Sequence, residues 1–199
     1  MRLVEGVADV VDLEAFLADL DAVAGAHGVA VQAFDARYVV DREHLALAVE
    51  LADRAFERGN NIARDRAVEI LLFAAGRRQI NRALEIGVEE GRREVVVVVD
   101  GAGDDGDGGG GGDGDRTDGG GDGDRADGGG DRGDENSTAD EDAAAAAVAD
   151  LLEPAETLGR FDPELVRDYY DVGDAELDAV EGGLPDLVRE RVALLVVER

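Results

Sequence analysis

Apolar residues recur every three to four positions along several stretches of the chain, and this period predicts amphipathic helices. In residues 12–24, Leu13, Phe16, Leu17 and Leu20 lie on one face. Residues 42–58 carry a similar stripe, with Asp41 as the N-cap and Gly59 as the stop. The same period predicts further helices over residues 67–74, 80–87, 143–152, 163–170, 175–180 and 187–190.

Short runs rich in β-branched residues predict the strands. Residues 29–35 form one such run, and residues 192–197 are expected to form a final buried strand. Val95 to Val99 are five consecutive valines, so both faces of that strand should be covered. The order of the elements predicts a mixed α/β (α+β) domain with a small, largely antiparallel sheet packed by helices.

Residues 101–142 differ in composition from the rest of the chain. Between Gly101 and Asp134 there are 17 Gly and 11 Asp, and the apolar side chains there are two alanines. Such a segment cannot bury enough surface to offset the entropy of ordering it. We therefore expect a disordered acidic insertion at 101–142 within one domain made of residues 1–100 and 143–199. Calcium-binding Gly/Asp repeats are the alternative, but they require a regular large apolar residue that this segment lacks.

The charge balance indicates the salt conditions in which the protein works more than it indicates its function. The 199 residues carry 48 acids and 20 bases, all of the bases are arginine, and the formal net charge is −28. This composition is typical of a salt-adapted cytosolic protein. Cysteine is absent, which excludes disulfides and thiolate metal sites. No leader peptide is recognisable and no apolar run approaches the roughly 20 residues that span a bilayer, so we expect a cytoplasmic protein without membrane contact.

The residues of common catalytic sites are also missing. His27 and His44 do not form a metal-binding pair, and neither a Walker-type loop nor a dinucleotide-binding fingerprint is present. The only serine, Ser137, lies in the expected insertion. We therefore expect no catalytic residue, no metal and no cofactor.

Arginine is concentrated in one part of this acidic chain. Between Arg54 and Arg93 there are nine arginines and six acids. Several of these arginines lie where predicted helices begin, namely Arg64, Arg66, Arg77, Arg78 and Arg82. Two interpretations remain open: internal ion pairs in an acid-rich protein, or contacts with an anionic ligand. Gln79 is either an ordinary surface amide or a group that reads a base edge or a partner's backbone.

Three segments resemble the PRPK-binding protein (CGI-type) family, the accessory subunit of the KEOPS complex, in a haloarchaeon-like, salt-adapted version. They are VQAFDARYVVDREHLALAVELA at 31–52, NIARDRAVEILLFAAGRRQINRALEIGV at 61–88 and YYDVGDAELDAVEGGLPDLVRERVALL at 169–195. The central segment is the most specific, because it joins an Asn-Ile start, an EILL helix and an Arg-Gln-Ile helix start. The insertion departs from the family's compact pattern.

The resemblance implies a non-catalytic subunit of a complex that makes threonylcarbamoyl-adenosine in tRNA. Its partners would be the kinase-like ATPase subunit, the 3′ CCA end of tRNA and, indirectly, the threonylcarbamoyl-transferase subunit. By position in the family motif, the RNA-binding residues would be Asn61, Arg64, Arg77, Arg78, Gln79 and Arg82. The main alternative is a protein-interaction scaffold without RNA contact, and an enzyme with unrecognised chemistry is a third possibility.

Overall fold

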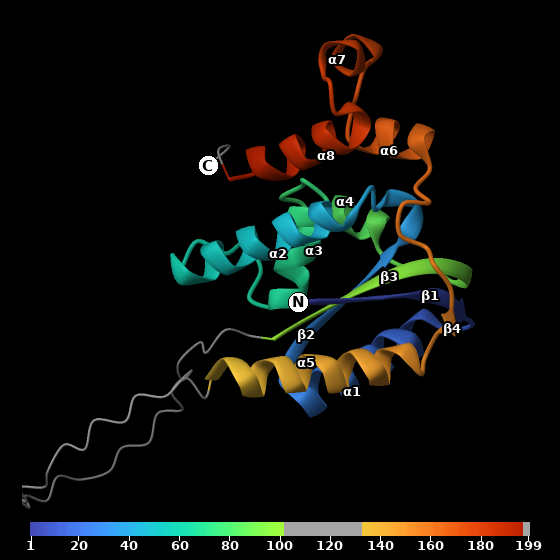
Figure 1. Cartoon of the computed structure of the whole chain (residues 1–199), viewed down its shortest axis with the longest axis vertical. Coiled ribbons are helices and arrows are strands. Elements are labelled where there is room, and N and C mark those ends of the chain that lie inside the picture. Colours follow the sequence, from blue (N-terminus) through green and yellow to red (C-terminus); the bar gives the residue numbers. More distant parts are fainter. Residues whose placement is uncertain (102–132, 197–199) are drawn as a thin grey trace, which may run out of the picture.

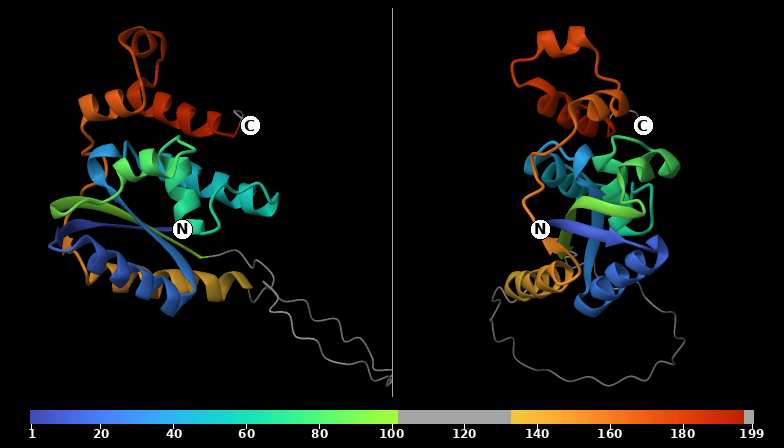
Figure 2. Two further views of the ribbon diagram at one scale, coloured as in Figure 1. Left: turned by 180° about the vertical axis from the view of Figure 1, so that it is seen from behind. Right: turned by 90° about the vertical axis from the view of Figure 1, so that its right-hand side faces the viewer.

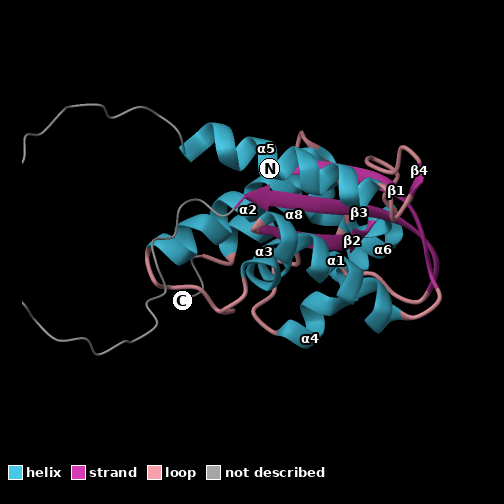
Figure 3. Ribbon diagram, turned by 90° about the horizontal axis from the view of Figure 1, so that it is seen from below, coloured by secondary structure: helices cyan, strands magenta, loops and turns pink. Residues whose placement is uncertain are grey.

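The computed structural model describes residues 1–101 and 133–196. These residues form a four-stranded antiparallel sheet between two layers of helices (Figure 1), which confirms the predicted fold class. The strands, drawn in magenta in Figure 3, lie in the order β2-β3-β1-β4 and comprise β1 (Arg2–Val10), β2 (Val29–Asp35), β3 (Gly91–Gly101) and β4 (Glu153–Pro154).

The helices cover the two faces of the sheet unequally. Helices α1 (Leu13–His27) and α5 (Gly133–Ala149) lie on one face (Figures 1 and 2). The other face is covered by α2 (Arg42–Glu57), α3 (Arg66–Ala74) and α4 (Ile80–Ala83), with two short 3-10 turns at Ala36–Tyr38 and Leu84–Ile86. A last group stacks over α2 and α3 and comprises α6 (Pro163–Tyr169), α7 (Asp174–Ala179) and α8 (Gly183–Leu194).

The valine run of β3 connects the two hydrophobic cores. Its five side chains are completely buried. Because side chains alternate along a strand, Val96 and Val98 enter the core beneath α2 and α3, whereas Val95, Val97 and Val99 enter the core beneath α1 and α5. The prediction that both faces of this strand are covered is therefore confirmed.

A charge network joins the ends of several elements beside the point where β3 ends. Arg66 at the start of α3 binds both Asp53 of α2 and Asp100 of β3. The amino group of Met1 lies 3.1 Å from Asp100 and 2.8 Å from Glu141 of α5. Buried charges need such partners, so Arg66 follows the internal-pair interpretation.

The predicted strand at 192–197 is wrong, because α8 continues to Leu194. The buried residues Leu184, Val188, Val192 and Leu195 recur at helical spacing, while Leu194 is 40 % exposed. A strand would bury alternate residues instead. The β-branched composition of this run was therefore a weaker signal than its period.

Strand β1 and the start of helix α5 also differ from the prediction. Strand β1 was not predicted, because Glu5 and Asp9 interrupt its apolar pattern. Glu5 is used for long-range pairing: its carboxylate accepts hydrogen bonds from the backbone N–H groups of Thr157 (2.8 Å) and Leu158 (2.7 Å). Helix α5 begins at Gly133, so it includes the last ten residues of the segment expected to be disordered, and residues 102–132 lie outside the described residues.

The most deeply buried ionisable ring belongs to His44 in the first turn of α2. Its Nε2 lies 2.9 Å from the carbonyl oxygen of Ala74, to which the Tyr170 hydroxyl also donates at 2.8 Å. Burial lowers the pKa of His44 below its ordinary 6.5, and Arg189 lowers it further, although the Ala74 carbonyl and Asp41 oppose the shift. The imidazole is therefore neutral in the folded protein.

We predict that His44 makes the fold acid-sensitive. Because the unfolded chain protonates this ring near pH 6.5 and the folded chain resists protonation, the free energy of unfolding should fall as pH drops below that value, by up to about 1.4 kcal/mol per pH unit. Denaturant titrations from about pH 7 to about pH 5 should show a smaller loss for His44→Gln than for the wild type. Equal losses in both proteins would contradict the prediction.

Candidate functional site

The junction between α3 and α4 forms a cavity lined with basic residues. Gly76 ends α3 with a left-handed backbone (φ 58°), which glycine adopts without strain. The N–H of Arg77 then closes the turn on the carbonyl of Leu72 at 3.1 Å. The resulting cavity has a volume of about 280 Å³ and is lined by Gly76, Arg77, Arg78, Gln79, Arg82 and Leu195.

Arg77 is held in place by the C-terminal part of the chain. Its guanidinium donates to the carbonyl oxygen of Tyr169, lies 3.2 Å from the Asp171 carboxylate and stacks 5.5 Å from the centre of the Tyr169 ring. A cation over an aromatic face is attracted to it. The orientation of Arg77 therefore depends on residues more than 90 positions away.

Tyr169 also contacts the other side of the cavity. Its hydroxyl donates to the carbonyl oxygen of Arg82 at 2.8 Å. Burial raises the pKa of Tyr169 well above its ordinary value although Arg77 opposes the shift, so the hydroxyl remains a donor. The Arg82 side chain lies 3.0 Å from Glu85 in an i,i+3 ion pair, which relieves the repulsion expected from its spacing to Arg78.

Four of the six predicted RNA-binding residues line this cavity, and two do not. Arg78, Gln79 and Arg82 are exposed at its rim, and Arg77 is half-buried beside them. Asn61 and Arg64 instead lie in the loop that precedes α3. The nine residues of α3 separate that loop from the cavity by about 13 Å, at about 1.5 Å per residue.

The α2–α3 loop, residues 58–65, is held by a carboxylate that sequence reasoning missed. Glu69 is completely buried and accepts hydrogen bonds from the backbone N–H groups of Ile62 (2.9 Å) and Ala63 (2.7 Å). Asn61 donates to the carbonyl oxygen of Ala63 at 2.7 Å, and Asp65 caps the helix by accepting from Val68. The free backbone N–H groups at and before the N-terminus of α3 are thus bound by carboxylates of the chain itself. The sequence signal that could have identified Glu69 as a buried carboxylate is its position at the start of an otherwise apolar run.

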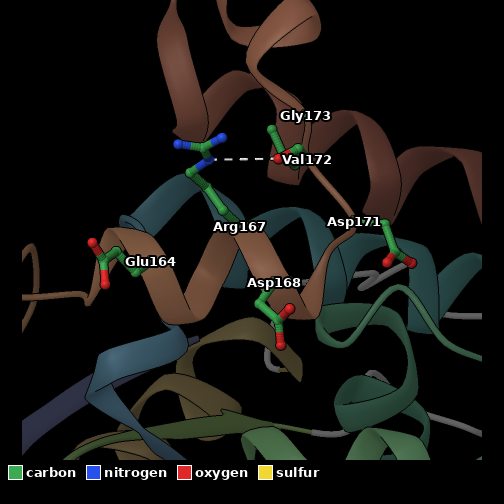
Figure 4. A pocket seen from close by; sticks show the side chains of 6 residues that line it. All are labelled: Glu164, Arg167, Asp168, Asp171, Val172 and Gly173. Atoms are coloured by element: carbon green, nitrogen blue, oxygen red, sulfur yellow. Dashed lines mark hydrogen bonds between the residues drawn. The ribbon is translucent and has the colours of Figure 1, made fainter.

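A second cavity lies over α6 and the turn that follows it (Figure 4). It has a volume of about 520 Å³ and is lined by Glu164, Arg167, Asp168, Asp171, Val172 and Gly173. Its one guanidinium is engaged, because Arg167 donates to the Val172 carbonyl at 3.5 Å and pairs with Asp174. The remaining carboxylates repel anions, so the α3–α4 cavity is the better candidate for an anionic ligand.

The described ranges 1–101 and 133–196 contain neither a metal-ligand cluster nor a membrane-spanning helix. No group of three His, Asp or Glu side chains there is arranged to hold a metal ion. Within these same ranges, no helix has both the length and the apolar character needed to cross a bilayer.

The cavity lined with basic residues at the α3–α4 junction is typical of a binding protein. The family model described as "Kinase binding protein CGI-121" matches residues 7–195, and the chain therefore belongs to this family of kinase binding proteins. No curated protein matches the sequence. The family resemblance that the sequence motifs indicated is confirmed at this level.

We predict that Glu69 determines the order of the α2–α3 loop. Glu69→Gln keeps the size of the side chain, but it removes the negative charge and replaces one of the two acceptor oxygens that face the N–H groups of Ile62 and Ala63 with an NH2 donor. This change should lower the free energy of unfolding by about 1–3 kcal/mol and speed hydrogen exchange at the amides of Ile62 and Ala63. The matched control is Glu50→Gln, since the exposed Glu50–Arg54 pair should be worth only about 0–1 kcal/mol. Unchanged exchange at both amides in Glu69→Gln would contradict this role.

Proposed function

We propose that this protein is the non-catalytic accessory subunit of a KEOPS-type complex, which binds the kinase-like ATPase subunit and helps recruit the 3′ CCA end of tRNA. The observation that carries the proposal is the family match over residues 7–195, because the family is described by kinase binding. The threonylcarbamoyl-transferase subunit would be reached indirectly through the kinase-like subunit.

Exposed aliphatic side chains on α4 and the following turn support a protein partner. Ile80 is 47 % exposed and Leu84 is 55 % exposed. They are four positions apart in a helical segment, so they share a face, and neither lines the basic cavity. Exposed apolar side chains grouped in this way mark interaction surfaces, and we assign this pair to the kinase-like subunit.

The basic cavity supports the role in tRNA recruitment. Arg77, Arg78, Arg82 and Gln79 surround one hollow on a chain with a net charge of −28. Arginine recognises phosphate through paired donors, and single-stranded RNA ends expose both phosphates and base edges. At high salt counterion release contributes little, so directed arginine contacts would carry the binding.

One experiment separates this function from the scaffold alternative. The protein is mixed at high salt with the kinase-like subunit and with tRNA that either retains or lacks its CCA end. Kinase binding with CCA-dependent tRNA retention supports both roles. Kinase binding without CCA dependence favours a scaffold, and no kinase binding by the folded protein would overturn the proposal.

We predict that the Ile80/Leu84 pair contributes most of the affinity for the kinase-like subunit. Replacing both residues with aspartate should weaken the complex at least about 100-fold, since each buried aliphatic side chain contributes about 1.5–3 kcal/mol. Titration calorimetry measures the loss. Leu17→Asp is the control, because Leu17 is 44 % exposed on α1 in the opposite layer. An equal loss in the control would place the kinase elsewhere.

We predict that charge alone does not account for RNA binding at the cavity. Arg78→Lys keeps the charge but loses the planar fork of donors, so the affinity for an RNA hairpin with a single-stranded CCA end should fall about tenfold. Fluorescence anisotropy at high salt measures the change. Arg92→Lys, on the exposed start of β3, should have no effect. Wild-type affinity in Arg78→Lys would refute the prediction.

A further inference from the structure

Asp171 lies directly after α6 and faces Arg77 of the basic cavity. Among the described residues it is the only non-glycine residue with a left-handed backbone (φ 53°). The helix ends in a turn in which the N–H of Val172 donates to the carbonyl oxygen of Arg167 at 2.9 Å, and glycine is the usual residue at the position of Asp171. The helix dipole also disfavours a negative charge at this end. The turn itself therefore gains nothing from the carboxylate.

The backbone around Asp171 is held by other side chains. Arg191 of α8 donates to the carbonyl oxygens of Tyr170 (3.3 Å) and Asp171 (3.4 Å). Arg77 donates to the carbonyl oxygen of Tyr169 and lies over the ring of the same residue. The Asp171 side chain is 80 % exposed, and ion pairs with such exposed partners contribute little to folding. The effect of this carboxylate therefore falls mainly on Arg77.

The carboxylate occupies a place on Arg77 that a phosphate group would take. Its Oδ2 lies 3.2 Å from a terminal nitrogen of the guanidinium, and Arg77 lines the α3–α4 cavity. A guanidinium binds carboxylates and phosphates through the same donors. An anionic ligand must therefore displace Asp171 from Arg77 or bind beside a negative charge. The displaced side chain has room, because Asp171 also lines the cavity of about 520 Å³ over α6 (Figure 4).

We propose that Asp171 is an internal competitor of the anionic ligand in the α3–α4 cavity: it pairs with Arg77 in the free protein and is displaced when the ligand binds. The inference rests on the proposed tRNA role and adds a means of regulation to the same site. A competitor tethered to the chain has a constant effective concentration, so it weakens the binding of every anion at Arg77. Small anions are thereby kept out, whereas an RNA end that also contacts Arg78 and Arg82 retains enough affinity to bind.

The test is a gain of affinity, which a misfolded variant cannot imitate. Asp171→Asn removes the charge with little change of shape, and asparagine tolerates a left-handed backbone. The probe is an RNA hairpin with a single-stranded 3′ CCA end, titrated by anisotropy at the lowest potassium chloride concentration that keeps every variant folded by circular dichroism. Loss of the competing ion pair should tighten binding about two- to fivefold. Asp168→Asn is the matched control, because Asp168 is exposed on α6 and lines the α6 cavity but not the basic one.

A double-mutant cycle shows whether the gain acts through Arg77. In an Arg77→Gln background, Asp171→Asn should leave the affinity unchanged, because the competitor no longer has a target. If Arg77→Gln does not fold, Arg77→Met takes its place, since its side chain keeps apolar contact with the Tyr169 ring. A purely structural role of Asp171 would not produce a gain that depends on Arg77.

The outcomes separate this inference from the proposed function. If Asp171→Asn binds the hairpin no more tightly than the wild type or than Asp168→Asn, or if its gain persists without Arg77, the competitor is refuted while the tRNA role stands. If no variant binds the hairpin, the proposed tRNA role fails. Inorganic pyrophosphate, titrated calorimetrically into the same variants, then decides the inference: a gain in Asp171→Asn that requires Arg77 supports it, and equal binding refutes it.

Discussion

The two-sided burial of β3 is the constraint on which the architecture depends. A strand of five valines in the middle of a sheet exposes apolar surface on both faces unless helices cover each of them. The helices on the two faces of the sheet differ in charge. On one face, the sequences of α1 and α5 contain no arginine. The arginine-rich segments are therefore collected on the opposite face of the sheet.

Separating the charges in this way makes local recognition possible on a strongly acidic protein. Averaged over the whole chain, a net charge of −28 would repel any polyanion. At the α3–α4 junction, however, Tyr169 and Asp171 orient Arg77, and Glu85 pairs with Arg82. These ion pairs reduce the net positive charge of the cavity, but they hold the guanidinium groups in fixed orientations. Where salt screens long-range attraction, a fixed orientation contributes more to ligand binding than net charge does.

Local periodicity predicted most helices and the central strand, since burial on one face leaves a repeat that can be read from sequence. It failed where partners are distant in the chain. Strand β1 was hidden because Glu5 serves residues near position 157. Of the six predicted RNA-binding residues, four line the α3–α4 cavity, and Asn61 and Arg64 lie at the other end of α3. Contacts such as Arg77 with Tyr169 leave no local pattern at all.

The close contact between the two elements that border the long Gly/Asp-rich segment has a practical consequence for protein engineering. The N–H of Gly101, at the end of β3, donates to Glu141 of α5 at 2.8 Å, so the two elements that border the connection are tied to each other directly. The cost of closing a flexible loop rises by only about 0.6 kcal/mol for each doubling of its length. This position is therefore suited to accept a reporter domain, a shortened linker or new chain termini while the sheet and both helical layers keep their packing.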